Sequence, residues 1–340
     1  MKKNIGMLAL IVCCVCLIPA CTNPPIFAAI EQEVKLKPAS IKSFVYKMVM
    51  LDNTLFATNG ALFKKTLGTT GKWANIGGAG GRCIGLAADK THLYGLFENN
   101  GVFTVYYTNA KAKDWNKVEN IGAVHFITGT ETIFAADKDS KQIYILKDGK
   151  VVSKWKWSDD VLPVGAARTY CLLGNGLYTA AGNRVSDTPT TDLKGICEGP
   201  GNAVFVLDAA NLHCYTGSGW SKKIAHKVES PQSITYLPRK QLVLIGGKNG
   251  YGEIKLTEGA DLAKAVSVSA GAEGSSIPQK NYHQYKNSVG KWLLNPIMAF
   301  DYENTDKNGY IIYAGALDPN ATYSGLWGFY YDKQIEWNRE

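Results

Sequence analysis

One unit of about forty residues recurs along the chain, and it constrains the fold more than any other feature. Each copy has an apolar-aromatic run, a polar or glycine turn and a second run, as in THLYGLFENNGVFTVYYT (91–108). Another run precedes each pair, and most pairs are followed by a fourth run that carries a tryptophan, as in SGWSKKI (218–224). Beyond the first twenty residues, no stretch keeps a 3.6-residue apolar period for long. The pattern predicts an all-β protein built from four-stranded antiparallel units.

A four-stranded meander of this length matches one blade of a β-propeller, and seven such units fill the chain from residue 42 onward. We expect blades at 42–77, 78–121, 122–160, 161–194, 195–229, 230–270 and 293–340. The fourth unit is short and lacks a tryptophan, so its last strand is expected to be degenerate. The excess, residues 271–292, is expected to be a long loop, and long loops in compact domains are often functional.

The recurring tryptophans have a structural explanation in a propeller. They are Trp73, Trp115, Trp155, Trp157, Trp220 and Trp337. The outermost strand of a blade is splayed away from the neighbouring blade, and a large side chain can fill the wedge between them. We therefore expect these tryptophans to pack between blades. A ligand-binding aromatic belt is the alternative.

The first twenty residues have the composition of an export signal. Two lysines precede an apolar run at 5–18, which is too short to span a bilayer comfortably. The run leads into LIPAC, which resembles the lipobox of bacterial lipoproteins. The resemblance implies a signal peptide at 1–20, lipidation of Cys21 with acyl chains such as palmitate, and a tether at 21–41. A plain secretory signal with an incidental cysteine is the alternative.

Four cysteines follow the expected lipidation site. They are Cys83, Cys171, Cys197 and Cys214. Export to an oxidising compartment allows one or two disulfides, and buried free thiols are the equal alternative. No CxxC pair occurs, so the cysteines do not predict a zinc site. The sequence does not fix how they pair.

A search for catalytic and metal-binding motifs gives only isolated candidates. No two of the five histidines stand at metal-ligand spacing, and none accompanies a nucleophile motif. Cys83, His125 and Arg168 could lie at inner-strand ends, where ordinary turn or core roles are favoured. The acidic stretches ENTDKNGY (303–310) and ADKDSK (136–141) are interpreted as hairpin turns rather than calcium loops. We expect no enzyme activity, no metal and no cofactor.

The chain carries a formal net charge of +8, and its lysines concentrate in two stretches, 141–157 and 221–227. A basic face of this kind could bind anionic glycans, anionic lipid headgroups or an acidic protein. Lysines on exposed outer strands also prevent edge-to-edge pairing, which is the simpler explanation. An exported protein is not expected to bind nucleic acid.

The lipobox, the divergent blades and the ending GLWGFYYDKQIEWNRE (325–340) resemble spirochaetal surface or periplasmic propeller lipoproteins. The resemblance implies a membrane-anchored, extracytoplasmic protein, expected at the outer membrane, although the sequence does not distinguish its surface face from its periplasmic face. The anchor, the long loop and the lack of a catalytic motif favour a module that binds a protein or glycan, such as a surface adhesin. The expected binding residues are Tyr282, His283, Tyr285 and Trp292. An envelope-assembly scaffold is the alternative, and a propeller enzyme acting on carbohydrate is a weaker one.

Overall fold

The computed structural model describes residues 39–340 apart from 70–71, 159–160, 190–191, 304–307 and 332–333. The expected signal peptide, Cys21 and the tether up to residue 38 lie outside the described residues. Residues Ala39–Glu340 form one compact unit. In the described part of the chain, no helix is both long and apolar enough to cross a membrane.

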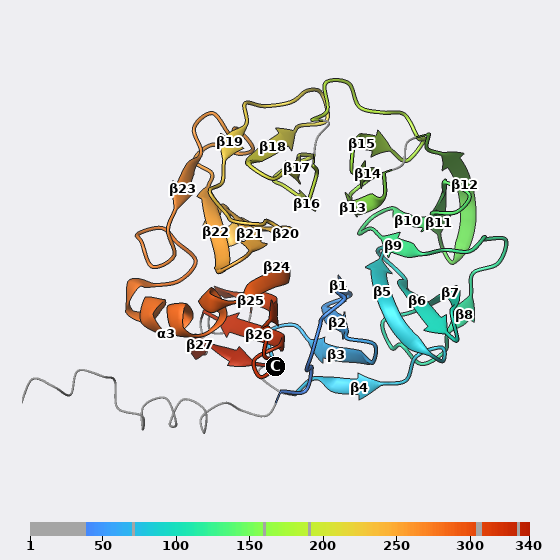
Figure 1. The fold of residues 1–340 in the computed structure, drawn as a ribbon, viewed down its shortest axis with the longest axis horizontal. Coiled ribbons are helices and arrows are strands. Elements are labelled where there is room, and N and C mark those ends of the chain that lie inside the picture. The colour runs from blue at the N-terminus through green and yellow to red at the C-terminus, as the bar shows by residue number, and fades with distance from the viewer. Residues whose placement is uncertain (1–38, 70–71, 159–160, 190–191, 304–307, 332–333) are drawn as a thin grey trace, which may run out of the picture. The chain divides into compact units, whose positions relative to one another are not determined.

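Short antiparallel sheets follow one another around a central axis, so the described chain forms a β-propeller (Figure 1). Four of these sheets have four strands, paired in chain order. The first has β1 (Lys47–Leu51), β2 (Thr54–Thr58), β3 (Leu62–Thr66) and β4 (Ala74–Ile76), and the second has β5 (Arg82–Ala88), β6 (Leu93–Asn99), β7 (Val102–Thr108) and β8 (Asn116–Lys117). The third has β9 (Phe126–Thr128), β10 (Ile133–Asp137), β11 (Gln142–Lys147) and β12 (Lys150–Lys156), and the fourth has β16 (Gly195–Glu198), β17 (Val204–Leu207), β18 (Asn211–Tyr215) and β19 (Ile224–Ala225).

The other two sheets differ from the expectation of seven separate four-stranded blades. One has only three strands in the described chain, as expected for a degenerate unit: β13 (Pro163–Ala167), β14 (Tyr170–Leu173) and β15 (Gly176–Thr179). The last has eight: β20 (Ser233–Leu237), β21 (Leu242–Gly247), β22 (Gly250–Lys255), β23 (Val266–Val268), β24 (Leu293–Glu303), β25 (Asn308–Leu317), β26 (Gly325–Tyr330) and β27 (Gln334–Arg339). A single parallel pair, Gly250 with Leu293, joins β22 to β24. The described strands therefore form six sheets.

Large aromatic side chains fill the space between neighbouring sheets. Trp73 is buried and meets the ring of Tyr313, from the last sheet, edge-on at a centroid distance of 5.8 Å. Trp155 of β12 stacks on Tyr178 of β15 at 5.5 Å. The indole N–H of Trp220 donates across sheets to the backbone oxygen of Ser186 at 2.9 Å. These contacts agree with the expectation for Trp73, Trp155 and Trp220, which pack between blades.

The ring is closed by contacts between the first and last sheets. The Lys65 ammonium on β3 lies 2.5 Å from a carboxylate oxygen of Glu340, and both side chains are nearly inaccessible, at 2% and 7%. The Trp73 indole N–H donates to the same Glu340 oxygen at 2.7 Å. The backbone N–H groups of Ser40 and Ile41 both donate to the carbonyl oxygen of Glu340. The end of the expected tether is thus part of the compact unit.

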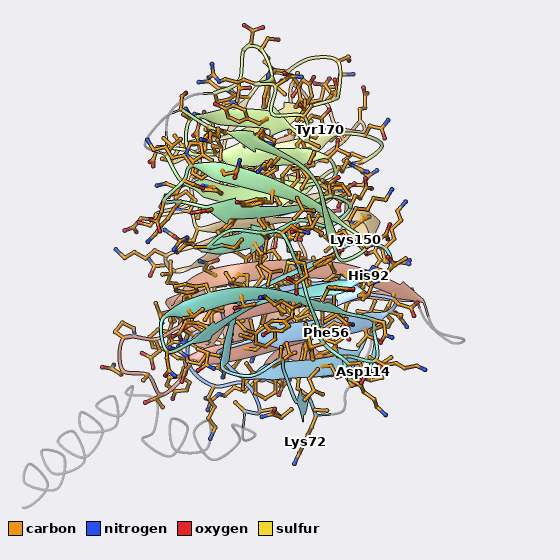
Figure 2. All side chains as sticks on the ribbon, turned by 90° about the vertical axis from the view of Figure 1, so that its right-hand side faces the viewer. Phe56, Lys72, His92, Asp114, Lys150 and Tyr170 are labelled. Carbon is orange, nitrogen blue, oxygen red and sulfur yellow. The ribbon has the colours of Figure 1, made fainter. Side chains whose placement is uncertain are left out.

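The basic stretch at 141–157 includes an outer edge strand. In β12, Lys150, Lys154 and Lys156 are exposed, and Figure 2 looks onto this side of the molecule, with Lys150 labelled. β12 pairs with β11 alone, at the end of its sheet. Charged side chains on such a strand protect its unpaired edge, which is the simpler of the two expected explanations.

All four described cysteines are free, so the expected possibility of one or two disulfides is not realised. Cys197 and Cys214 lie in one sheet, but Phe205 of the strand between them pairs with both. Burial raises the pKa of the Cys83, Cys171 and Cys214 thiols to about 12. These thiols therefore act as small core side chains.

Candidate functional site

The expected long loop at 271–292 is a folded segment that covers the outer part of the eight-stranded sheet. It contains two 3-10 turns, η3 (Gln279–Asn281) and η4 (Val289–Lys291), on either side of the short helix α3 (Tyr282–Asn287). We call residues 271–292 the α3 segment. Figure 1 shows α3 beside β27, between β23 and β24 in the chain.

Tyr285 holds α3 against the sheet. Its side chain is buried, and its hydroxyl oxygen accepts a hydrogen bond from the backbone N–H of Tyr251 at 3.1 Å. The neighbouring Gly250 has a φ of +97°, and a Cβ there would lie 2.4 Å from the Tyr285 hydroxyl oxygen. Only glycine fits at this position, because it tolerates the left-handed backbone and leaves room for the phenol.

Gln284 makes a second attachment, in which its side-chain amide forms hydrogen bonds with a backbone as a neighbouring strand would. Its side-chain N–H donates to the backbone oxygen of Trp337 at 2.9 Å, and its side-chain oxygen accepts from the Trp337 N–H at 3.0 Å. Trp337 lies on β27, the outer strand of the sheet. One amide side chain therefore satisfies both backbone groups of a residue on an edge strand.

A buried carboxyl group makes the third attachment. Glu253 on β22 is only 3% exposed and accepts hydrogen bonds from the Ser276 N–H at 2.9 Å and the Ser276 hydroxyl at 2.6 Å. The Tyr310 hydroxyl donates to the Ser276 backbone oxygen at 2.6 Å. Burial raises the pKa of Glu253 to about 7, although the two hydrogen bonds from Ser276 oppose that shift.

The structure places the four expected binding residues on different sides of the α3 segment. Tyr282 and His283 are exposed, whereas Tyr285 packs in the core. Trp292 is half-buried and stacks on Tyr323 with a centroid distance of 5.6 Å. The four residues therefore do not form one continuous exposed surface, because the short helix turns its third aromatic side chain inward.

Three lysines accompany the two exposed aromatic side chains: Lys280, Lys286 and Lys291. No ion pair joins any of them to a carboxylate in the part of the chain that the structure describes. No acidic residue occurs between Gln279 and Lys291. The exposed side chains of residues 279–291 are therefore basic and aromatic, and the one acidic residue of the α3 segment, the exposed Glu273, lies before them.

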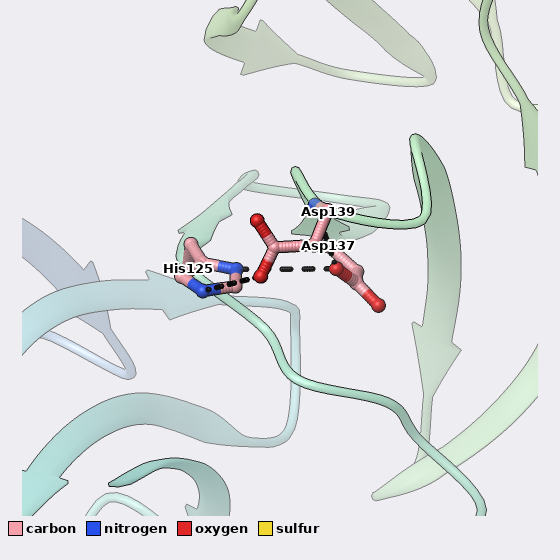
Figure 3. A group of neighbouring side chains, drawn as sticks. All are labelled: His125, Asp137 and Asp139. Carbon is pink, nitrogen blue, oxygen red and sulfur yellow. Dashed lines mark hydrogen bonds and ion pairs between the residues drawn. The ribbon is translucent and has the colours of Figure 1, made fainter. Parts of the chain in front are cut away.

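A second group of polar side chains lies on the third sheet, where the sequence indicated only a histidine and a separate turn. Phe126 of β9 pairs with Ala136 of β10, so the residues just beyond them, His125 and Asp137, are neighbours across the strands. Asp139 follows in the turn to β11. Figure 3 shows both carboxylates facing the His125 ring. Their separation in the chain hides this group from any search for closely spaced motifs.

Asp137 is held as an ionised carboxylate by its own turn. Burial alone would raise its pKa, but hydrogen bonds from Ser140 and the Asp139 N–H, together with the charge of His125, lower the pKa below its ordinary value. The Ser140 hydroxyl donates at 2.7 Å and the Asp139 N–H at 3.0 Å. The predicted turn at 136–141 is present and also supplies two carboxylates to one histidine.

The other two isolated candidates, Arg168 and Cys83, make contacts that stabilise the fold. The Arg168 guanidinium donates to the backbone oxygens of Gly201 at 2.6 Å and Gly199 at 3.2 Å, so it links two sheets. Cys83 is buried, and its backbone oxygen accepts a hydrogen bond from Thr58. No hydrogen bond or ion pair between described residues joins Cys83, His125 and Arg168 to one another.

A cavity of about 580 Å³ lies between the first and last sheets. Its lining residues are Asn53, Leu67, Gly68, Thr69, Arg239, Asp301 and Tyr302. The Asp301 carboxylate accepts a hydrogen bond from the Arg239 backbone N–H at 2.9 Å. Most glycosidases use two carboxyl groups across the scissile bond, and only one lines this cavity in the described chain.

A model of the TP013X lipoprotein family matches residues 1–340. An uncharacterized lipoprotein of Treponema pallidum (strain Nichols) is 28% identical over 371 residues, covering 94% of this chain and 93% of the relative. A second from the same organism is 27% identical over 383 residues, covering 95% and 96%. One chain in the solved structure titled "Crystal Structure of Mitotic Checkpoint Complex" matches with a TM-score of 0.50 and 9% identity, covering 69% of this chain and 87% of that chain. The structural match concerns the fold alone.

Proposed function

Because the chain belongs to the TP013X lipoprotein family, we propose that it is a membrane-anchored interaction module whose binding surface is the outer face of the α3 segment. Membership of a lipoprotein family implies membrane association and an extracytoplasmic location. We also propose that the chain is cleaved after residue 20, that Cys21 is lipidated and that the protein is attached to the outer membrane.

The proposal rests on how the α3 segment is attached to the eight-stranded sheet. Tyr285, Gln284 and the Glu253–Ser276 pair fix its inner side to the sheet. Its outer side chains remain exposed. A surface that is already rigid loses little conformational freedom on binding, so more of the contact energy contributes to affinity.

The charge of this face indicates the chemistry of its partner. Lys280, Lys286 and Lys291 are exposed in the same segment as the exposed Tyr282, and tyrosine is enriched among the residues that dominate binding interfaces. Lysines at a rim accelerate encounter with an oppositely charged surface. We therefore propose an acidic protein surface as the ligand, with an anionic glycan as the alternative.

We further propose that the role is not enzymatic and that the eight-stranded sheet counts as two blades. The first point is supported by the single carboxylate at the cavity and by relatives whose names include no activity. The second is supported by the single pair, Gly250 with Leu293, that joins β20–β23 to β24–β27. Counted this way, the propeller has the seven blades expected from the sequence.

Site-directed photo-crosslinking on intact cells tests the binding surface. A photoreactive amino acid replaces Tyr282, and the matched control replaces Val152, which is exposed on the basic edge strand β12. We expect adducts from position 282 that disappear when the three lysines of the α3 segment are changed to glutamate. Adducts from position 152 alone would contradict the proposal and favour β12 as the binding surface.

Protease treatment of intact and permeabilised cells separates the remaining alternatives. Digestion on intact cells supports an adhesin displayed on the surface. Protection until the outer membrane is opened supports an envelope-assembly scaffold.

A further inference from the structure

We propose that His125, Asp137 and Asp139 form a binding site for a divalent transition-metal ion of the zinc class. The three side chains come from the start of β9, the end of β10 and the turn that follows it. This proposal is independent of the interaction function, because the site lies on a different sheet from the α3 segment.

The distances suit ligands that share a cation better than they suit direct hydrogen bonds. The Nε2 atom of His125 lies 3.5 Å from Asp139 Oδ2, and its Nδ1 atom lies 4.0 Å from Asp137 Oδ1 (Figure 3). One donor atom from each residue can be chosen so that all three lie within 4.8 Å of one another. Two ligands of a tetrahedral zinc ion are about 3.4 Å apart, so one ring nitrogen and one oxygen from each aspartate, which lie within 4.8 Å of one another, need approach by at most about 1.4 Å to share an ion.

The histidine has an unused ring nitrogen. His125 Nδ1 is inaccessible to solvent and has no hydrogen-bond partner among the described residues. The side chains of His125, Asp137 and Asp139 are 18%, 9% and 70% exposed, so two of the three are largely buried and the third is open to water. A buried nitrogen without a partner is costly, and a metal ion bound at Nδ1 itself would remove that cost.

Two other histidine–aspartate groups in the same protein lack this opening. His213 Nε2 makes a direct contact of 2.7 Å with Asp208 Oδ2, which leaves no room for an ion between them. His92 lies 3.8 Å and 3.9 Å from two aspartates, but its Nδ1 already has the Thr91 hydroxyl as a partner at 2.8 Å. Only His125 combines two carboxylates with an unpartnered ring nitrogen in the described chain.

The ligand types decide the class of metal. One imidazole and two carboxylates, completed by water, suit zinc and its neighbours, whereas calcium and magnesium favour all-oxygen sites. No lysine or arginine forms an ion pair with either carboxylate within the described residues, so no built-in cation competes. The site would bind zinc with water in the remaining positions.

Equilibrium dialysis of the full chain in detergent, first stripped with a chelator, tests the proposal with zinc as the probe. We expect one zinc ion per chain, and the variants H125Q and D139N should each weaken binding at least tenfold. D139N is preferred to a change at Asp137, because Asp139 is exposed and Asp137 holds the turn together. The control H283Q removes an exposed histidine that has no carboxylate beside it and should bind zinc like the wild type.

A second readout separates coordination from adsorption. Zinc should raise the melting temperature of the wild type and of H283Q but not that of D139N, since only a ligand bound to the folded state stabilises it. The proposal is overturned if the wild type binds no zinc, if H125Q and D139N bind it unchanged, or if calcium binds more tightly than zinc. Unchanged circular dichroism of each variant excludes misfolding as the cause of a loss.

Discussion

Replacing Glu340 by glutamine should weaken the ring closure far more than a surface ion pair would suggest. The carboxylate of Glu340 accepts from Lys65 at 2.5 Å, from the Trp73 indole at 2.7 Å and from the Tyr330 hydroxyl at 2.9 Å. The glutamine is nearly the same size but carries no charge. It therefore leaves the Lys65 ammonium buried without this counter-charge.

The magnitude follows from the exposure of the two partners. Breaking a buried pair by removing one charge costs about 3–5 kcal/mol, because the remaining ion keeps its desolvation penalty. The pair Lys248–Glu229 is the internal comparison, since its nitrogen–oxygen distance is also 2.5 Å but both side chains are 57% exposed. Exposed pairs contribute about 0–1 kcal/mol. We expect E340Q to cost about 3 kcal/mol or more and E229Q to cost less than about 1 kcal/mol.

Urea unfolding followed by circular dichroism measures the free energy of unfolding of E340Q and of E229Q. The double variant K65M/E340Q completes a mutant cycle. The double variant should be more stable than E340Q alone, because it no longer buries the Lys65 charge after its Glu340 partner has been neutralised. If E340Q and E229Q lower the free energy of unfolding equally, burial does not strengthen this contact and the reasoning is refuted.

Three further predictions concern the α3 segment and the link between sheets. The folded-state pKa of Glu253, about 7, lies above the ordinary 4.5, so the folded state holds the proton more tightly than the unfolded state does. The contribution of Glu253 to stability is therefore complete below pH 4.5. That contribution should be lost as the pH rises to 7, by up to about 3 kcal/mol, and urea unfolding of the wild type against E253Q across this range measures it. G250A should destabilise by about 1–3 kcal/mol and speed amide exchange in α3, since its Cβ would collide with Tyr285; unchanged exchange would contradict this. R168A should cost about 2 kcal/mol in urea unfolding by leaving the carbonyls of Gly199 and Gly201 without their donor, whereas a neutral effect would mean that water replaces it.

The strands were largely predictable because their signal is local. The alternating runs at 91–108 correspond to β6 and β7, with the Asn100–Gly101 turn between them. The tryptophans were also predictable, because a side chain of that size on an outer strand has few places to pack. Both inferences need only neighbouring residues and the known shape of a blade.

The helix and the joined sheets were not predictable in the same way. Tyr285 and Val289, four residues apart and both buried, are the main helical signal in the α3 segment, and its helix has only six residues. Such a short helix is stable only through its contacts with the sheet. The Gly250–Leu293 pair depends on how that segment folds back, which no local pattern records.

The candidate metal site was hidden for a different reason. His125 and Asp137 meet only because Phe126 pairs with Ala136, and shifting that register by one residue would turn one side chain to the opposite face. The residue types were visible in the sequence, but the pairing that unites them was not.

The position of Ser40 and Ile41 has a mechanical consequence. A force applied to the propeller through the chain before Ala39 acts near these two residues, whose N–H groups donate hydrogen bonds to the carbonyl oxygen of Glu340. The load is then carried by the seam that holds the first and last sheets together, not by a loop on the rim. An anchored molecule under tension would therefore begin to open at its seam, and the strength of that seam sets the force it withstands.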